Sequence, residues 1–185
     1  TLWQTAPVES RDSVRTVALI GLGTMGTGIA EVVARHGFAV RAIDIDDTTV
    51  SDARQRIEAS TDRAVARDKL TASERSGILD RILFTTNLQE CLTSDIVIEA
   101  VPENLELKRQ VLGQLDGLLP DRVIWCTNTS SLSVTEISTA VSQPSRVVGL
   151  HFFNPAPVQD FVEIVRTVVT DDEVVEHIRA FAEQI

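Results

Sequence analysis

Residues 16–26, with the sequence TVALIGLGTMG, decide the fold of this chain of 185 residues. The first five form a short apolar run with several β-branched side chains, which is typical of a strand buried on both faces. A turn of the pattern G-x-G-x-x-G follows, and residues 24–36 then show the periodicity of a helix that ends at Gly37. The stretch therefore predicts a strand, a glycine turn and a helix, the opening of a βαβ unit.

The glycine turn has the spacing that a dinucleotide requires. Gly21 permits the tight turn, Gly23 lets a pyrophosphate approach the backbone, and Gly26 allows the helix to pack closely on the strand. Thr24 and Met25 lie at the start of the helix, where free N–H groups face an anion. The position of the turn between a strand and a helix favours a dinucleotide site over a glycine turn without a ligand.

A second apolar run, residues 38–43, ends at Asp44, which stands 18 residues after Gly26 (44 − 26). A carboxylate at this place accepts hydrogen bonds from the adenosine ribose and repels the additional phosphate of NADP. Asp46 and Asp47 add negative charge nearby. We therefore predict NAD as the cofactor. The alternative is a solvated acid that merely ends a strand.

Apolar runs and helical patterns alternate through the rest of the chain, which predicts an α/β fold. We expect a Rossmann-type doubly wound, mostly parallel sheet with helices on both faces, and an antiparallel far edge. Residues 15–185 form this domain, and residues 1–14 form a loose arm. The expected strands are 16–20, 38–43, 82–85, 95–100, 123–126, 146–152 and 161–169. The expected helices are 24–36, 48–70, 105–119 and 171–185, the last capped by Thr170.

Composition limits the partners. The net charge of −10 repels nucleic acid, and no apolar run is long enough to cross a membrane. Cys91 and Cys126 lack metal-ligand spacing and, with only three histidines present, predict no metal site. We expect a cytoplasmic protein with reduced cysteines.

Three polar clusters follow apolar strands, at residues 99–104, 128–131 and 151–154. Ligands of open α/β sheets bind at such strand ends. His151 is a candidate general base, because histidine exchanges protons near neutral pH. Glu163 stands 12 residues later (163 − 151), inside an apolar run, where a carboxylate needs a partner. From these residues alone a catalytic pair and a structural role remain equally open.

The chain resembles the NAD-binding domain of the 3-hydroxyacyl-CoA dehydrogenase family over residues 16–185. The matching stretches are ALIGLGTMGTGIA (18–30), IDID (43–46), DIVIEAVPENLELK (95–108), CTNTSSL (126–132) and GLHFFNPAPVQDFVEIV (149–165). The resemblance implies oxidation of the 3-hydroxyl of an acyl-CoA to a 3-keto group, or the reverse, with hydride exchanged with NAD.

The same resemblance implies roles for individual residues. His151 takes the hydroxyl proton, Glu163 orients His151, and Ser130 binds the substrate oxygen. Asn154 lies beside the same pocket. Three further residues are assigned to the cofactor: Glu103, Lys108 and Asn128.

For the CoA moiety the resemblance points to the long helix after the second strand, where the nearest matches are Ser60, Arg67 and Lys69. A solvated helix face remains an equal alternative. Family members carry a second, all-helical domain that forms much of a homodimer interface and is absent from this chain. Two other hypotheses are the same chemistry on an acyl-carrier-protein substrate and a non-catalytic NAD-binding protein.

Overall fold

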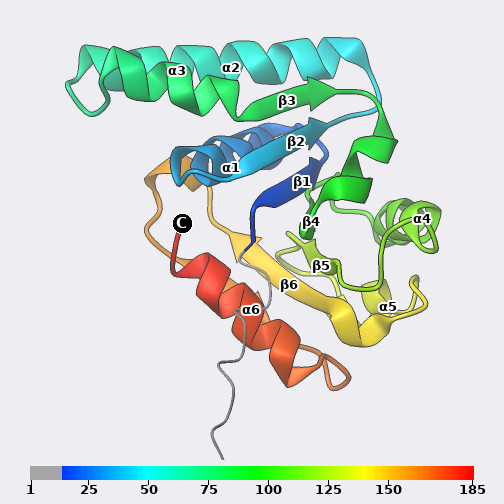
Figure 1. Ribbon diagram of the computed structural model, residues 1–185. Coiled ribbons are helices and arrows are strands. Elements are labelled where there is room, and N and C mark those ends of the chain that lie inside the picture. The colour runs from blue at the N-terminus through cyan, green and yellow to red at the C-terminus, as the bar shows by residue number, and fades with distance from the viewer. Residues whose placement is uncertain (1–13) are drawn as a thin grey trace, which may run out of the picture.

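A seven-stranded sheet forms the centre of the computed structural model, which describes residues 14–185. The strands lie in the order β3-β2-β1-β4-β5-β6-β7 (Figure 1). Their bounds are β1 Thr16–Ile20, β2 Ala39–Ile43, β3 Ile82–Thr85, β4 Ile96–Glu99, β5 Ile124–Thr127, β6 Val147–Phe152 and β7 Val162–Val165. The first six are parallel and β7 pairs antiparallel with β6, as the sequence predicted. Of the proposed arm, only Val14 lies within the described residues.

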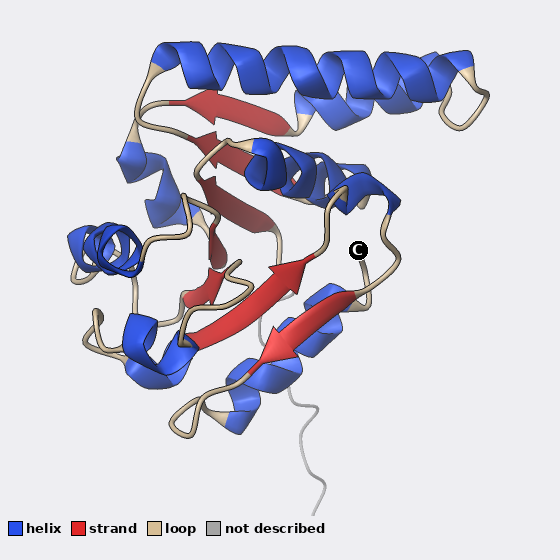
Figure 2. Cartoon of the chain, turned by 180° about the vertical axis from the view of Figure 1, so that it is seen from behind, coloured by secondary structure: helices blue, strands red, loops and turns tan. Residues whose placement is uncertain are grey.

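Helices cover both faces of the sheet, which confirms the doubly wound α/β fold (Figures 1 and 2). The α-helices are α1 Thr24–Arg35, α2 Asp47–Ala66, α3 Ala72–Asp80, α4 Leu105–Leu115, α5 Val134–Ser138 and α6 Asp172–Ala182. Short 3₁₀ turns are η1 Leu88–Thr93, η2 Pro144–Arg146 and η3 Ala156–Val158.

Alternate residues of one strand supply two separate cores. Val17 and Leu19 of β1 pack with Ile29 of α1 and the residues of α2, α3 and α6, whereas Ala18 and Ile20 face the side of α4 and α5. This period of two explains why every position of the run is apolar, because both faces of the strand are buried.

The helical region after β2 differs from the sequence prediction. One helix was expected over residues 48–70, but α2 ends at Ala66 and a separate helix, α3, follows. Thr71 begins α3 with a capping box, in which its hydroxyl accepts from the N–H of Glu74 and the Glu74 carboxylate accepts from the N–H of Thr71. Two satisfied N–H groups at one point favour a new helix start over continuation of α2.

Other boundaries also moved. The helix α4 ends at Leu115 rather than at residue 119, β7 is shorter than the expected 161–169, and α5 was not predicted. The proposed cap Thr170 is wrong: Asp171 is the N-cap of α6, and the Thr170 hydroxyl donates to the carbonyl of Val147. Thr170 therefore fastens the segment before α6 to β6.

No helix within residues 14–185 has both the length and the apolar character needed to cross a bilayer.

Candidate active site

A cleft of about 910 Å³ lies at the carboxyl ends of the parallel strands, where doubly wound sheets bind their ligands. Its walls come from the loops that follow β1 to β6 and from one face of α4. Ten of the residues predicted for the site line it: Gly21, Gly23, Thr24, Met25, Asp44, Glu103, Asn128, Ser130, His151 and Asn154. Residues that the sequence predicted in five separate segments therefore meet at one place.

The glycine turn between β1 and α1 has the geometry that its spacing predicted. Gly21 has φ +92°, and a Cβ there would lie 2.8 Å from the backbone of Ala100. A Cβ on Gly26 would lie 1.8 Å from the carbonyl oxygen of Gly21, so α1 can approach the turn this closely only with glycine at position 26. Nothing lies within 4 Å of a Cβ on Gly23, which leaves open space above the backbone.

This turn fits the pyrophosphate of a dinucleotide. Gly23 is the N-cap of α1 and has no side chain that could accept hydrogen bonds from the free N–H groups of the first turn. Those N–H groups carry the positive end of the helix dipole and border the cleft.

Asp44 follows β2 and lies in the cleft, as predicted. Its Oδ2 accepts a 2.6 Å hydrogen bond from the N–H of Leu22, and its Oδ1 accepts one of 2.7 Å from the N–H of Ile45. Each carboxylate oxygen keeps a further lone pair for a ribose hydroxyl. Among the described residues that line the cleft, none is Lys or Arg, so a 2′-phosphate would meet only the negative charge of Asp44 and Asp46.

Sequence reasoning missed the apolar wall beyond Asp44. Ile45 is 95% exposed and lies in the cleft with Leu88 of η1 and with Leu107 and Val111 of α4. Apolar side chains beside a ribose-binding carboxylate suit the flat face of an adenine. The signal in the sequence was Ile45 itself, an apolar residue placed between two aspartates after a strand.

His151 and Glu163 face each other directly across the antiparallel pair of β6 and β7. The Nδ1 atom of His151 lies 2.8 Å from Oε2 of Glu163. The ring of Phe153 packs against the imidazole at 4.4 Å between ring centres and in turn against Phe161 at 4.5 Å. The imidazole is therefore held by Glu163 and Phe153, and His151 lines the cleft.

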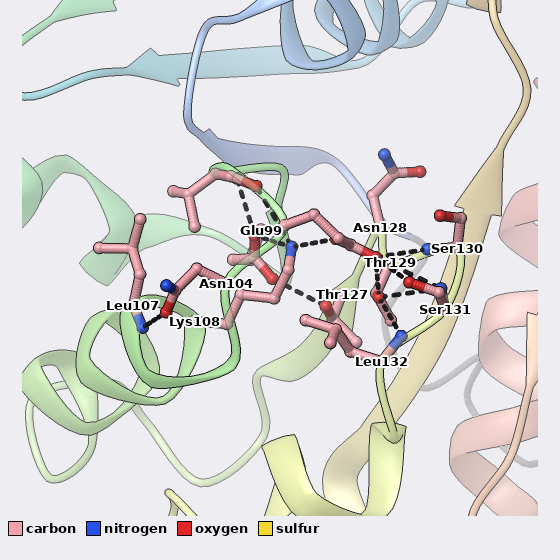
Figure 3. Close-up of polar contacts among 12 residues, drawn as sticks. Glu99, Asn104, Leu107, Lys108, Thr127, Asn128, Thr129, Ser130, Ser131 and Leu132 are labelled. Atoms are coloured by element: carbon pink, nitrogen blue, oxygen red, sulfur yellow. Dashed lines mark hydrogen bonds and ion pairs between the residues drawn. The ribbon is translucent and has the colours of Figure 1, made fainter.

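Residues 129–131, in the loop after β5 (Figure 3), are held by hydrogen bonds to Glu103, which lies in the loop after β4. Oε1 of Glu103 accepts from the Thr129 hydroxyl at 2.5 Å and from the N–H groups of Ser130 and Ser131 at 3.1 and 3.3 Å. Burial alone would raise the pKa of Glu103, but the Thr129 hydrogen bond, the charge of Lys108 and the Ser130 N–H together lower it. Glu103 is therefore a stable carboxylate at the edge of the cleft.

Lys108, which the resemblance assigns to the cofactor, is not among the residues that line the cleft. It is fully buried at the start of α4, and its Nζ lies 2.8 Å from Oε1 of the equally buried Glu99. Its second carboxylate neighbour is Glu103, at 3.4 Å. Lys108 thus contacts the site through Glu103.

The two asparagines have different surroundings. Oδ1 of Asn128 accepts a 2.8 Å hydrogen bond from the N–H of Phe152, which joins the ends of β5 and β6 beneath the cleft. Asn154 is exposed at the rim of the cleft, beyond His151.

Of the three residues proposed for CoA, only Ser60 lines a hollow in the described residues. Ser60 is on α2, where its hydroxyl donates to Glu31 of α1 at 2.9 Å, but Arg67 is the C-cap of α2 and Lys69 lies in the turn beyond it. A second hollow of about 290 Å³ lies between α1 and α2. The basic residues beside Ser60 in that hollow are Arg56 and Arg63, so the helix presents basic side chains other than those predicted.

Within residues 14–185 no group of three or more His, Cys, Asp or Glu side chains is arranged to hold a metal ion.

Comparison with known proteins gives one family. The family described as "3-hydroxyacyl-CoA dehydrogenase, NAD binding domain" matches residues 16–185. The chain is 45% identical over 166 residues to 3-hydroxyadipyl-CoA dehydrogenase of Escherichia coli, covering 90% of this chain and 35% of that protein. It is 40% identical over 176 residues to 3-hydroxybutyryl-CoA dehydrogenase of Mycobacterium tuberculosis, covering 94% of this chain and 61% of that protein.

Solved structures agree with the sequence comparison. The crystal structure of 3-hydroxybutyryl-CoA dehydrogenase from Escherichia coli matches with a TM-score of 0.91 at 43% identity, over 93% of this chain and 36% of that one. The corresponding (S)-specific enzyme from Ralstonia eutropha matches with a TM-score of 0.91 at 40% identity, over 93% of this chain and 61% of that one.

This chain thus spans between about a third and three fifths of the relatives it matches. The family match, the strand order and the glycine turn with Asp44 all describe the same unit. The chain belongs to the family of NAD-binding domains of 3-hydroxyacyl-CoA dehydrogenases.

Proposed function

We propose that this chain is the cofactor domain of an enzyme that oxidises the 3-hydroxyl of a 3-hydroxyacyl-CoA to a 3-keto group, or catalyses the reverse reaction. The observation that carries the proposal is the hydrogen-bonded pair His151–Glu163, whose imidazole opens onto the same cleft as the glycine turn. A base and a hydride acceptor must reach the same carbinol carbon, and one cleft with both elements meets that demand.

His151 acts as the base in this proposal. Its Nδ1 donates to Glu163, which leaves Nε2 with the lone pair that takes the proton of the substrate hydroxyl. The carboxylate of Glu163 fixes that tautomer and stabilises the imidazolium that forms. Bound NAD supplies the hydride acceptor when the carbinol is oxidised.

Ser130 positions the substrate oxygen. Its hydroxyl is exposed in the cleft, and its backbone N–H is held by Glu103. A hydroxyl donor close to the reacting oxygen lowers the energy of the charge that develops there as the proton leaves. Asn154, at the rim of the cleft, is proposed to contact the same substrate.

An acyl-CoA substrate is supported by the names of the relatives and by the helix pair α1–α2. The E. coli and M. tuberculosis relatives are named for 3-hydroxyadipyl-CoA and 3-hydroxybutyryl-CoA. Arg56 and Arg63 flank Ser60 in the hollow between those helices, where guanidinium groups suit the phosphates of CoA.

The remaining parts of the proposal concern the whole protein. We propose that a helical domain outside this chain covers the cleft and that the full-length protein is a homodimer. A cytoplasmic location is supported by the two unpaired cysteines, both buried in the described residues.

The experiment is NADH production by the full-length protein with a short and a medium 3-hydroxyacyl-CoA, compared with this 185-residue chain. NADH formed by the full-length protein supports the reaction. Absence of NADH with both substrates, while NAD still binds, contradicts it.

A further inference from the structure

Three ionisable side chains form a continuous chain between the core and the cleft. Glu99 ends β4 and Lys108 lies in the first turns of α4, and both side chains are fully buried. Oε1 of Glu99 accepts from Lys108 Nζ at 2.8 Å and from the N–H of Val101 at 2.7 Å. Its Oε2 accepts from the Thr127 hydroxyl at 2.7 Å (Figure 3). Both oxygens of the Glu99 carboxylate thus accept hydrogen bonds inside the protein.

Lys108 connects the buried Glu99 to Glu103 at the edge of the cleft. Its Nζ also contacts the carbonyl of Val101 at 3.2 Å and Oε2 of Glu103 at 3.4 Å. The other oxygen of Glu103 holds Thr129, Ser130 and Ser131. Glu99 therefore joins α4 to the end of β5, and Glu103 joins the loop after β4 to residues 129–131.

The stability of the fold does not require such an arrangement. Burying an ion pair costs desolvation that its attraction roughly offsets, and a well-packed apolar pair of similar volume is often as stable. What the ion pair adds is direction, because an ammonium with three donors can be satisfied in only a few geometries. Because the Lys108 ammonium is fixed by Glu99, it also holds the carboxylate of Glu103, which would otherwise be less restrained at the surface.

We infer that Glu99 and Lys108 are positioning residues: through Glu103 they hold the loop of residues 129–131, and with it the hydroxyl of Ser130, in place for the reaction. Neither residue lines the cleft, and Lys108 contacts Glu103, which does. The inference rests on the proposed function, since it assigns the loop to substrate binding.

The test uses three variants of the full-length protein. Lys108→Met keeps the length of the side chain and removes the charge. The double variant Glu99→Gln/Lys108→Met also removes the carboxylate that would otherwise be left buried without an opposite charge. Ile78→Ala is the control, because Ile78 is buried in α3, on the face of the sheet opposite α4.

Two readouts report on the loop and one on the rest of the site. Amide hydrogen exchange of residues 129–131 measures how firmly the loop is held. The kcat and KM for a 3-hydroxyacyl-CoA measure how much the position of the loop matters for the reaction. Affinity for ADP-ribose, which lacks the nicotinamide, measures the glycine turn together with the adenosine part of the cleft.

For Lys108→Met we expect exchange in residues 129–131 to rise about tenfold. We expect kcat to fall about 10- to 100-fold, since a displacement near 1 Å has effects of this size. The KM and the ADP-ribose affinity should change less than about threefold. The double variant should regain thermal stability relative to Lys108→Met but not kcat. Ile78→Ala should lose stability and keep kcat.

The inference is overturned if exchange and kcat are both unchanged in Lys108→Met, or if the double variant recovers kcat together with stability. An equal loss of kcat in Ile78→Ala also overturns it, because destabilisation alone would then explain the result. Should the unaltered protein oxidise no 3-hydroxyacyl-CoA, the proposed function fails. The exchange rates of residues 129–131 then decide the positioning role by themselves.

Discussion

The N–H of Leu22, inside the glycine turn, donates a 2.6 Å hydrogen bond to Oδ2 of Asp44 at the end of β2. The turn proposed for the pyrophosphate and the acid proposed for the neighbouring adenosine ribose are thus joined within the protein itself. Asp44 therefore holds the turn as well as lining the cleft. Changes at Asp44 should therefore affect both contacts.

Asp44→Ala should lower NAD affinity by more than the loss of ribose hydrogen bonds alone, by about 100-fold, since two contacts worth about 1.4 kcal/mol each are lost. Asp44→Asn keeps an oxygen for Leu22 N–H but loses charge, and we expect a smaller loss. Calorimetric titration with NAD and NADP measures both variants. Equal affinities of Asp44→Asn and Asp44→Ala would show that the turn does not depend on this residue.

The middle and the last glycine of the turn, Gly23 and Gly26, should respond differently to an added methyl group. Gly26→Ala places a Cβ 1.8 Å from the Gly21 oxygen and should cost about 3 kcal/mol or more of folding free energy. Gly23→Ala meets nothing within 4 Å and should cost less than about 1 kcal/mol, yet lower NAD affinity about tenfold. Urea unfolding and NAD titration separate the two effects. Full NAD affinity in Gly23→Ala would place the pyrophosphate elsewhere.

His151→Gln should lower kcat by about 10² to 10⁴ in the full-length protein and leave NAD affinity nearly intact, because His151 lies away from the glycine turn. Glu163→Gln should lower kcat by about 10², since the amide no longer fixes the imidazole tautomer. Steady-state kinetics and NAD titration measure both. A parallel loss of NAD affinity in His151→Gln would contradict the assignment of the base.

Glu103→Gln should change the pH dependence of stability. The pKa of Glu103 is lowered in the folded protein, so its carboxylate stabilises the fold above the ordinary value of 4.5 and this contribution is lost as pH falls through the folded pKa. The unaltered protein should therefore be more stable than Glu103→Gln at pH 7, and the difference should shrink near pH 3. Glu106→Gln, at an exposed pair with Arg109, is the control and should show little difference at either pH. A difference that is the same at both pH values would show that the charge of Glu103 is not involved.

Neither cysteine should react with a thiol reagent in the folded protein. Burial, and to a smaller extent the charge of Glu90, raises the pKa of Cys91 to about 12. Burial raises the pKa of Cys126 as well. At pH 8 only about one Cys91 in 10⁴ is then a thiolate. A chromogenic disulfide reagent should find no thiol before guanidinium is added and both thiols afterwards. Rapid labelling of the native protein would contradict the burial of these residues.

The sequence predicted those site residues whose place is determined by the end of a single strand. Gly21, Asp44 and Ser130 each follow an apolar strand, so their meeting at one edge of the sheet is a consequence of parallel pairing. His151 and Glu163 met because the connection between their strands turns back on itself.

Lys108 could not be placed in this way. A lysine in a polar segment is usually exposed, and its burial depends on how α4 is rotated over the ends of β4 and β5. By contrast, Arg56 and Arg63 were readable, because they stand four residues before and three after Ser60 and so share its helix face. The break between α2 and α3 was also readable, in the capping box of Thr71 and Glu74.

The cross-strand pairing of His151 with Glu163 limits how this domain can change during evolution. Side chains alternate between the faces of β7, so moving that strand by one residue would turn Glu163 away from the imidazole. A longer or shorter connection over residues 153–161 leaves the pair intact as long as the strand pairs as before. The inherited constraint is therefore on the alignment of two strands more than on the length of the loop between them.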